Sequence, residues 1–154
     1  MVKFEITTDI DRPVDEVFAY VTDPSRAPEW VSAIIEIKDA DPPGFGSKAT
    51  QVVKFLGRRF EFTSEVVEWD LNRRWAQTAS QPFPIKNQVT FSPRGTGTRL
   101  DAVLEGEVGT FFKVAEPLVT AMAKRQFASD YGNLKELLEA GVAASSKAEE
   151  KTKA

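Results

Sequence analysis

The side chains that could do chemistry in this sequence are carboxylates, phenols, hydroxyls, amides and basic groups, because its 154 residues include no histidine and no cysteine. This excludes thiol nucleophiles, Ser-His-Asp triads, zinc and iron–sulfur sites and histidine-ligated haem. The two phenols are Tyr20 and Tyr131. Tyr131 falls on the apolar stripe of a predicted helix and is the best candidate for a catalytic proton donor. The alternative is a core tyrosine whose hydroxyl the protein itself satisfies.

Carboxylates and arginines are interspersed along the predicted strands. They are Glu61, Glu65, Glu68, Asp70, Glu105 and Glu107 among Arg58, Arg59, Arg73, Arg74 and Arg99. Cross-strand ion pairs on a solvated sheet face account for this pattern. No spacing selects two of these carboxylates for a hydrolase, and we expect neither a metal site nor a cofactor.

Two amides lie at positions where alternation predicts an apolar face. Asn87 shares its face with Val89 and Phe91, and Gln77 shares its face with Trp75. An amide buried without a hydrogen bond costs on the order of 1–3 kcal/mol. Each amide therefore either orients a ligand or pairs with a backbone group at a strand end.

Aromatic side chains accompany these amides. Phe60 and Phe62 alternate on one predicted strand, Trp75 lies on the next, and Trp30 follows a proline-bounded turn. They form either the wall of a ligand pocket, with Trp30 as its lid, or an ordinary core in which Trp30 anchors its loop. Both interpretations require the same apolar side chains.

Hydrophobic periodicity predicts the elements that must position these groups. A period of two predicts strands over Val2–Ile10 and over 33–40, 47–56, 59–70, 73–81, 85–93 and 98–108. A short helix over 13–22 begins at Pro13, and a second helical turn covers 25–30. The connections between the later strands are too short for parallel crossovers, so the sheet is antiparallel. The inward face of strands 33–40 and 73–81 is ambiguous.

The segment from Phe111 to Glu139 is predicted as one long helix. Its apolar residues recur every three or four positions: Phe112, Ala115, Val119, Ala123, Phe127, Tyr131, Leu134 and Leu138. Pro117 either bends this helix or marks its first turn. The helix is the only adequate cover for one face of a seven-stranded sheet. We therefore predict an α+β fold in which a curved antiparallel sheet wraps around a long C-terminal helix, with two short helices between the first two strands.

Composition limits the remaining possibilities. The chain suits one domain over 1–141, followed by a disordered tail over 142–154 that lacks large apolar side chains. A net charge of −3 argues against nucleic-acid binding. No apolar run approaches the roughly 20 residues of a membrane span, so stable membrane insertion is not expected. No apolar leader is evident, and we expect a cytoplasmic protein.

Several motifs occur in a recognisable order. They are Asp11-Arg12-Pro13-Val14-Asp15-Glu16-Val17-Phe18, then Asp23-Pro24 followed by Trp30, then Gly44-Phe45-Gly46, then Gly97-Thr98-Arg99-Leu100. With this order, residues 2–140 resemble the polyketide cyclase/dehydrase family of the START-like, birch-pollen-allergen-like (SRPBCC) superfamily. The resemblance implies the helix-grip fold and places Trp30 near a cavity. It implies no single activity, because superfamily members bind lipids, sterols, polyketides or quinones, act as aromatases and cyclases, or serve as interaction modules. No catalytic residue transfers by motif.

Our leading hypothesis is a protein that binds a small hydrophobic molecule, of lipid, polyketide or aromatic type, between the sheet and the C-terminal helix. The predicted ligand-binding residues are Trp30, Phe60, Phe62, Trp75, Gln77, Asn87, Val89, Phe91, Val119, Ala123 and Phe127. A ligand would enter by movement of the 44–46 loop, of the Trp30 segment or of the chain near Gly109. The protein would act as a monomer or homodimer.

Two alternatives remain open. One is an enzyme of cyclase, aromatase or dehydratase type, with Tyr131 or an inward carboxylate as the proton-transfer group. The other is an interaction module without a cavity. It would have a filled interior and an exposed apolar patch to which Phe83, Phe111 and Phe112 contribute.

Overall fold

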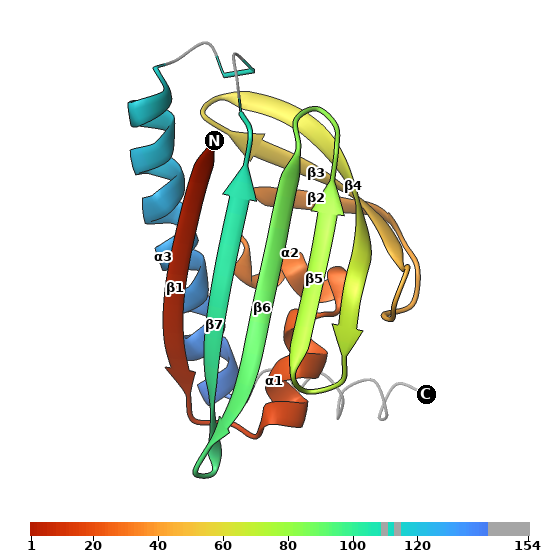
Figure 1. The fold of residues 1–154 in the computed structure, drawn as a ribbon, viewed down its shortest axis with the longest axis vertical. Helices are drawn as coiled ribbons and strands as arrows, with labels where there is room; N and C mark the ends of the chain where they lie inside the picture. Colours follow the sequence, from red (N-terminus) through yellow and green to blue (C-terminus); the bar gives the residue numbers. More distant parts are fainter. Residues whose placement is uncertain (109–110, 113–114, 142–154) are drawn as a thin grey trace.

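The computed structural model describes residues 1–108, 111–112 and 115–141. One seven-stranded antiparallel sheet forms the body of the molecule, and the described helices lie behind it in the view of Figure 1. The strands are β1 (Val2–Ile10), β2 (Ile34–Ala40), β3 (Lys48–Phe55), β4 (Arg58–Asp70), β5 (Arg74–Ala79), β6 (Ile85–Arg94) and β7 (Gly97–Gly106). The helical elements are α1 (Val14–Val21), the 3-10 turn η1 (Pro24–Arg26), α2 (Ala27–Trp30) and α3 (Glu116–Glu139).

The sheet has the order β1-β7-β6-β5-β4-β3-β2. The first and last strands in the sequence therefore pair with each other, in a register that runs from Val2 opposite Gly106 to Ile10 opposite Thr98. Every other pair of neighbours is consecutive in the chain, as short connections require. The predicted α+β architecture is confirmed, including the short helices between β1 and β2. The predicted tail, 142–154, lies outside the described residues.

Irregular pairing explains why the facing of the strand predicted over 33–40 was ambiguous in the sequence. β2 shifts register against β3 twice, between Ile34 and Glu36 and between Ile37 and Asp39. Each shift breaks the strict alternation of side chains. β4 has a similar shift between Val66 and Glu68, opposite β5. Such irregularities bend and twist strands, and they lie in the part of the sheet that curls in Figure 1.

The long helix begins later than predicted. Phe111 and Phe112 precede it, and α3 starts at Glu116 with Pro117 in its first turn. Proline fits there because the first N–H groups of a helix have no intrahelical acceptor. Of the two interpretations of Pro117, the structure therefore supports a helix start.

Arg12 caps the C-terminal end of α3. Its Nε donates to the carbonyl oxygen of Leu138 at 2.9 Å, and its Nη2 donates to that of Glu139 at 3.2 Å. The last carbonyl groups of a helix lack intrahelical donors and carry partial negative charge, so a guanidinium suits both needs. The backbone N–H of Asp11 also donates to the Glu139 carboxylate at 2.9 Å. The junction between β1 and α1 thus holds this end of α3 in place.

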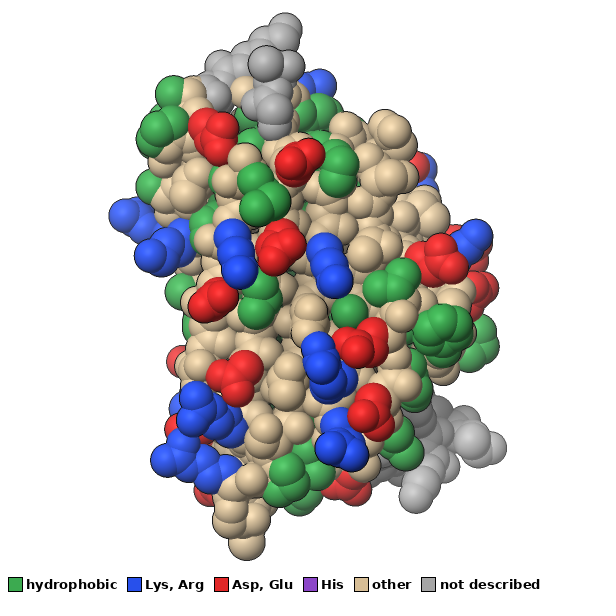
Figure 2. All heavy atoms as spheres, viewed as in Figure 1, with side chains coloured by type: hydrophobic (Ala, Val, Ile, Leu, Met, Phe, Trp, Pro, Cys, Tyr) green, Lys and Arg blue, Asp and Glu red, His purple; other side chains and the backbone are tan. Residues whose placement is uncertain are grey.

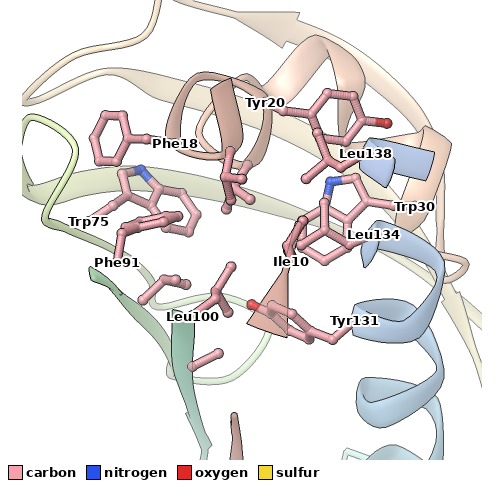
Figure 3. Close-up of a cluster of buried hydrophobic side chains, with 14 of the residues drawn as sticks. Ile10, Phe18, Tyr20, Trp30, Trp75, Phe91, Leu100, Tyr131, Leu134 and Leu138 are labelled. Carbon is pink, nitrogen blue, oxygen red and sulfur yellow. The ribbon is translucent and has the colours of Figure 1, made fainter. Parts of the chain in front are cut away.

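Two groups of buried apolar side chains fill the space between sheet and helices. One includes Tyr131, Leu134 and Leu138 from the second half of α3, packed with α1, Trp30 and the middle of the sheet (Figure 3). The other includes Val119 and Phe112, packed with the start of β1 and with β3 and β4. The two halves of α3 therefore contact different surroundings.

The outer face of the sheet carries charges of both signs (Figure 2). Arg94 pairs with Asp9 at 3.2 Å, Arg74 with Glu68 at 3.4 Å, and Lys38 with Glu61. These side chains are exposed, so each pair contributes little to stability. The predicted ion-paired, solvated sheet face is confirmed.

Candidate functional site

A cavity of about 270 Å³ lies between the sheet and α3. Its walls come from strands of the whole sheet, from the segment around α2 and from α3 between Val119 and Tyr131. Most of the lining side chains are apolar. Among the predicted ligand-binding residues, the lining includes Trp30, Phe60, Phe62, Trp75, Gln77, Asn87, Val119, Ala123 and Phe127, and it also includes Tyr131.

Val89 and Phe91 are the two predicted residues that do not line the cavity. Both are buried on the inward face of β6, as alternation predicted. At this end of the strand, however, α1 covers the sheet, and Phe91 packs edge-on against Phe18 with ring centroids 5.0 Å apart. The structure thus places these two residues under α1, because alternation identifies the inward face of a strand but not the element that covers it.

The lining also includes residues that the sequence argument did not select. Apolar examples are Val2, Phe4, Phe55, Leu104, Val108 and Phe112. Alternation in β1 already placed Val2 and Phe4 on the inward face, so a consistent use of that signal would have found them. Gln126 and Asp130 come from α3, on positions next to its apolar stripe.

Phenylalanines close one end of the cavity. Phe60 has its ring centroid 5.2 Å from that of Phe62, 5.8 Å from Phe83 and 5.7 Å from Phe112, in tilted or edge-on contacts. Phe83 and Phe112 are only 7% and 4% exposed. Phe83 and Phe112 therefore do not form the expected apolar surface patch, and Phe111 is half-buried and packs against both of them.

Tyr131 and Asn87 bring polar groups to the opposite walls of the cavity. Tyr131 is 2% exposed, and its hydroxyl has no hydrogen-bond partner among the described residues. The same holds for the side-chain oxygen of Asn87. Burial and the nearby Asp130 carboxylate raise the pKa of Tyr131, while the Asn87 side chain opposes them by offering a hydrogen bond to the ionised phenol. Tyr131 is therefore a neutral hydrogen-bond donor at physiological pH.

The indole nitrogens of Trp30 and Trp75 are also buried without a partner among the described residues. In Figure 3 the Trp30 nitrogen lies on the Leu138 side of its ring, away from the Tyr131 hydroxyl, and the Trp75 nitrogen lies toward Phe18. Neither indole N–H therefore lies beside the Tyr131 hydroxyl. Their rings contribute apolar surface to the cavity.

Asp130 joins α3 to the segment that follows α2. One of its carboxylate oxygens accepts from both the backbone N–H and the hydroxyl of Ser32, and Gln126 donates to that hydroxyl at 3.0 Å. Burial raises the pKa of Asp130, and the two bonds from Ser32 act against this shift. The carboxylate is engaged with the protein and holds the Trp30 segment against α3.

The described part of the chain contains neither a metal-binding cluster nor a membrane-spanning helix. No group of three or more acidic side chains there is arranged to hold a metal ion. No helix among those residues is long and apolar enough to cross a bilayer.

Comparison with known proteins identifies the family. The family described as "Polyketide cyclase / dehydrase and lipid transport" matches residues 1–139. The chain belongs to this family. The resemblance noted in the sequence is thus confirmed. No curated protein matches the sequence significantly.

Solved structures share the fold of this polyketide cyclase/dehydrase family member at low sequence identity. TTHA0849 from Thermus thermophilus is 19% identical, with a TM-score of 0.76 over 90% of this chain and 98% of that one. Ara h 8.0201 is 13% identical, with a TM-score of 0.65 over 93% and 97% of the two chains. The Aha1 dimer from Colwellia psychrerythraea is 15% identical, with a TM-score of 0.64 over 90% and 97%. At these identities the likeness establishes the helix-grip fold and no shared activity.

Proposed function

We propose that the protein binds a small, largely apolar molecule of lipid, polyketide or aromatic type in the cavity between the sheet and α3. The observation that carries this proposal is the cavity of about 270 Å³ with its mainly apolar lining. Its volume is near the lower end of the roughly 300–1,000 Å³ usual for ligand pockets, which favours a compact ligand. The description of the family, which includes lipid transport, supports the same class of function.

Burial of apolar surface supplies the affinity in this proposal. At about 25 cal/mol per Å², each 100 Å² of apolar ligand surface removed from water contributes roughly 2.5 kcal/mol. The aromatic side chains Phe60, Phe62 and Trp75 offer broad contact surfaces at small cost in side-chain entropy. The few polar groups of the lining then set orientation rather than overall affinity.

We place the entrance between the β2–β3 loop and the η1–α2 segment. Pro43 and Lys48 are exposed and also line the cavity, and the half-buried Pro24 and Ala27 line it from the η1–α2 segment. Phe45, at the tip of the 44–46 loop, is 75% exposed. The alternative entrance near Gly109 lies outside the described residues.

Ligand capture tests this proposal. The protein, purified from cells under native conditions, is analysed by mass spectrometry for bound small molecules. The same protein is screened by thermal shift against fatty acids, sterols, flavonoids and quinones. We expect either a copurified apolar ligand or an increase in melting temperature with at least one class, because a ligand that binds only the folded state stabilises it. No copurified ligand and no shift with any class would contradict the proposal.

An enzyme of cyclase, aromatase or dehydratase type is the second candidate, and Tyr131 is the observation that favours it. A buried phenol that lines the cavity and has no partner among the described residues is placed to donate a hydrogen bond to a ligand oxygen on which negative charge develops. Incubation with a linear poly-ketone, followed by mass spectrometry for loss of water, tests it. Turnover that disappears in Tyr131→Phe while binding persists would establish the enzyme.

The proposal also covers the interaction-module alternative, the cellular location and the oligomeric state. A filled interior was expected for an interaction module, and the cavity argues against that alternative. We retain the cytoplasmic location and the monomeric or homodimeric state as part of the proposal. Size-exclusion chromatography with light scattering tests the latter.

A further inference from the structure

Building on the proposed function, we propose that the ligand carries a neutral carbonyl group whose oxygen accepts hydrogen bonds from Tyr131 and Asn87. Tyr131 reaches from α3 toward the sheet, with its hydroxyl directed to the Leu100 side in Figure 3. Asn87 comes from β6, and both residues line the cavity. The two residues therefore present polar groups to the same space from opposite walls.

Tyr131 and Asn87 together carry more hydrogen-bond donors than they can satisfy between themselves. If the Asn87 amide donates to the phenolic oxygen, the Tyr131 O–H remains free to donate. If Tyr131 instead donates to the amide oxygen, both N–H groups of Asn87 remain free. Either orientation of the amide leaves at least one donor without an acceptor among the described residues. A buried donor left unpaired costs free energy that a ligand oxygen would recover.

Gln77 adds a second amide beside this pair. It lies directly opposite Asn87 in the register of β5 and β6 and also lines the cavity. Its side chain has no hydrogen-bond partner among the described residues. Its N–H groups are thus available to a second lone pair on the same ligand oxygen, which has two.

The charges around the cavity select a neutral oxygen over a carboxylate. Among the lining residues, Asp130 and Lys48 are the charged ones. Asp130 is adjacent to Tyr131 in the chain and acts on it electrostatically. Lys48 is exposed at the start of β3. A ligand carboxylate bound at Tyr131 would therefore lose its hydration, meet a negative group and find no buried cation, whereas a ketone, ester or quinone oxygen would not.

Three probes of similar shape separate these cases: benzophenone, diphenylmethane and diphenylacetate. The first two differ only by a carbonyl in place of a methylene, and the third carries a carboxylate. Affinities are measured by calorimetry for wild type, Tyr131→Phe, Asn87→Leu and Tyr20→Phe. Tyr20 is the matched control because it is the other buried tyrosine, bonds to Glu29 and does not line the cavity. Thermal melts verify that each variant is folded.

For each protein, the affinity for benzophenone is divided by the affinity for diphenylmethane. The two probes differ in water solubility, but this difference is the same for every protein and cancels when the ratios are compared. We expect Tyr131→Phe and Asn87→Leu each to lower the ratio by up to about tenfold, with little change for diphenylmethane itself. Tyr20→Phe should leave the ratio unchanged. Diphenylacetate should bind wild type more weakly than benzophenone.

Several results would overturn the inference while leaving the proposed function intact. One is a ratio that is equal in all four proteins, as expected if water alone satisfies Tyr131. Another is tightest binding by diphenylacetate. If no probe binds wild type, both the cavity-binding function and the inference that rests on it are contradicted.

Discussion

The backbone N–H and the hydroxyl of Ser32 both donate to one carboxylate oxygen of Asp130, at 3.2 and 2.9 Å. This contact connects the segment after α2 to α3, at the edge of the cavity. Asp130 is 6% exposed, and burial raises its pKa above the ordinary value of 3.8 despite the two hydrogen bonds. The folded protein therefore binds this proton more tightly than the unfolded chain does.

This difference predicts how Asp130 affects stability as pH changes. At pH values between the ordinary pKa and the raised pKa, the Asp130 carboxyl group is protonated more often in the folded state than in the unfolded state. The contribution of Asp130 to the free energy of unfolding is therefore present at low pH and is lost as the pH rises. Asp130→Asn removes that dependence and keeps an acceptor for Ser32. We expect the stability of the variant relative to wild type to increase from about pH 4 upward and then level off.

Urea unfolding of both proteins over a series of pH values measures this difference directly. Parallel curves of unfolding free energy against pH would show that the carboxyl group is not perturbed in the folded state.

Arg12→Met tests the capping of α3. The substitution keeps an apolar side chain of similar length but removes both donors to the carbonyl groups of Leu138 and Glu139. We expect a loss of about 1–2 kcal/mol in the free energy of unfolding, measured by urea titration. Arg94→Met is the matched control, since the pair of Arg94 with Asp9 is exposed and its loss should cost less than about 0.5 kcal/mol. Equal losses in the two variants would argue against a special role for Arg12.

Two glycine-to-alanine substitutions should change stability in opposite directions. A Cβ at Gly97 would lie 2.7 Å from the carbonyl oxygen of Ile10, where β7 and β1 approach closely. Backbone must shift to relieve that contact, so Gly97→Ala should cost about 2 kcal/mol. Gly132 is exposed in α3, and a Cβ there meets nothing within 4 Å. Gly132→Ala should stabilise the protein by about 0.5–1 kcal/mol. Thermal melts that rank the two variants in the reverse order would contradict the described geometry.

Ala123→Phe should fill the cavity from the side of α3. Ala123 is half-buried and lines the cavity, so a phenyl group there occupies the space assigned to the ligand. We expect apolar probes such as benzophenone to lose at least about tenfold in affinity without a loss of thermal stability. Ala128→Phe, on an exposed position of the same helix, is the control and should bind as wild type does. Unchanged binding by Ala123→Phe would place the ligand elsewhere.

Regular periodicity made most of the architecture predictable. The alternation in Val2–Ile10 and the three- and four-residue spacing after Pro117 each report a single covered face, which is a local property of the sequence. The start of α3 was misplaced because Phe112 and Ala115 continue the helical spacing, although the structure describes both of them as non-helical. In β2, two register shifts removed the alternation on which an assignment of faces depends.

The site was predictable only in part, for a related reason. Alternation assigned Asn87 to the inward face, and it does line the cavity. It gave the same assignment to Phe91, which does face inward but is covered by α1 and does not reach the cavity. Whether an inward side chain meets empty space or another element depends on contacts between distant parts of the chain. The link between Ser32 and Asp130, across 98 positions, is of this kind and left no local signal.

Retargeting the domain to new ligands should be feasible by changing one short stretch of α3. Leu134 and Leu138 pack in the core, and Arg12 caps the turn in which the helix ends. Val119, Ala123 and Phe127 face the cavity from earlier turns of the same helix. A combinatorial library confined to those three sites would vary the shape of the binding chamber while the anchoring residues stay constant, so a large share of its members should still fold.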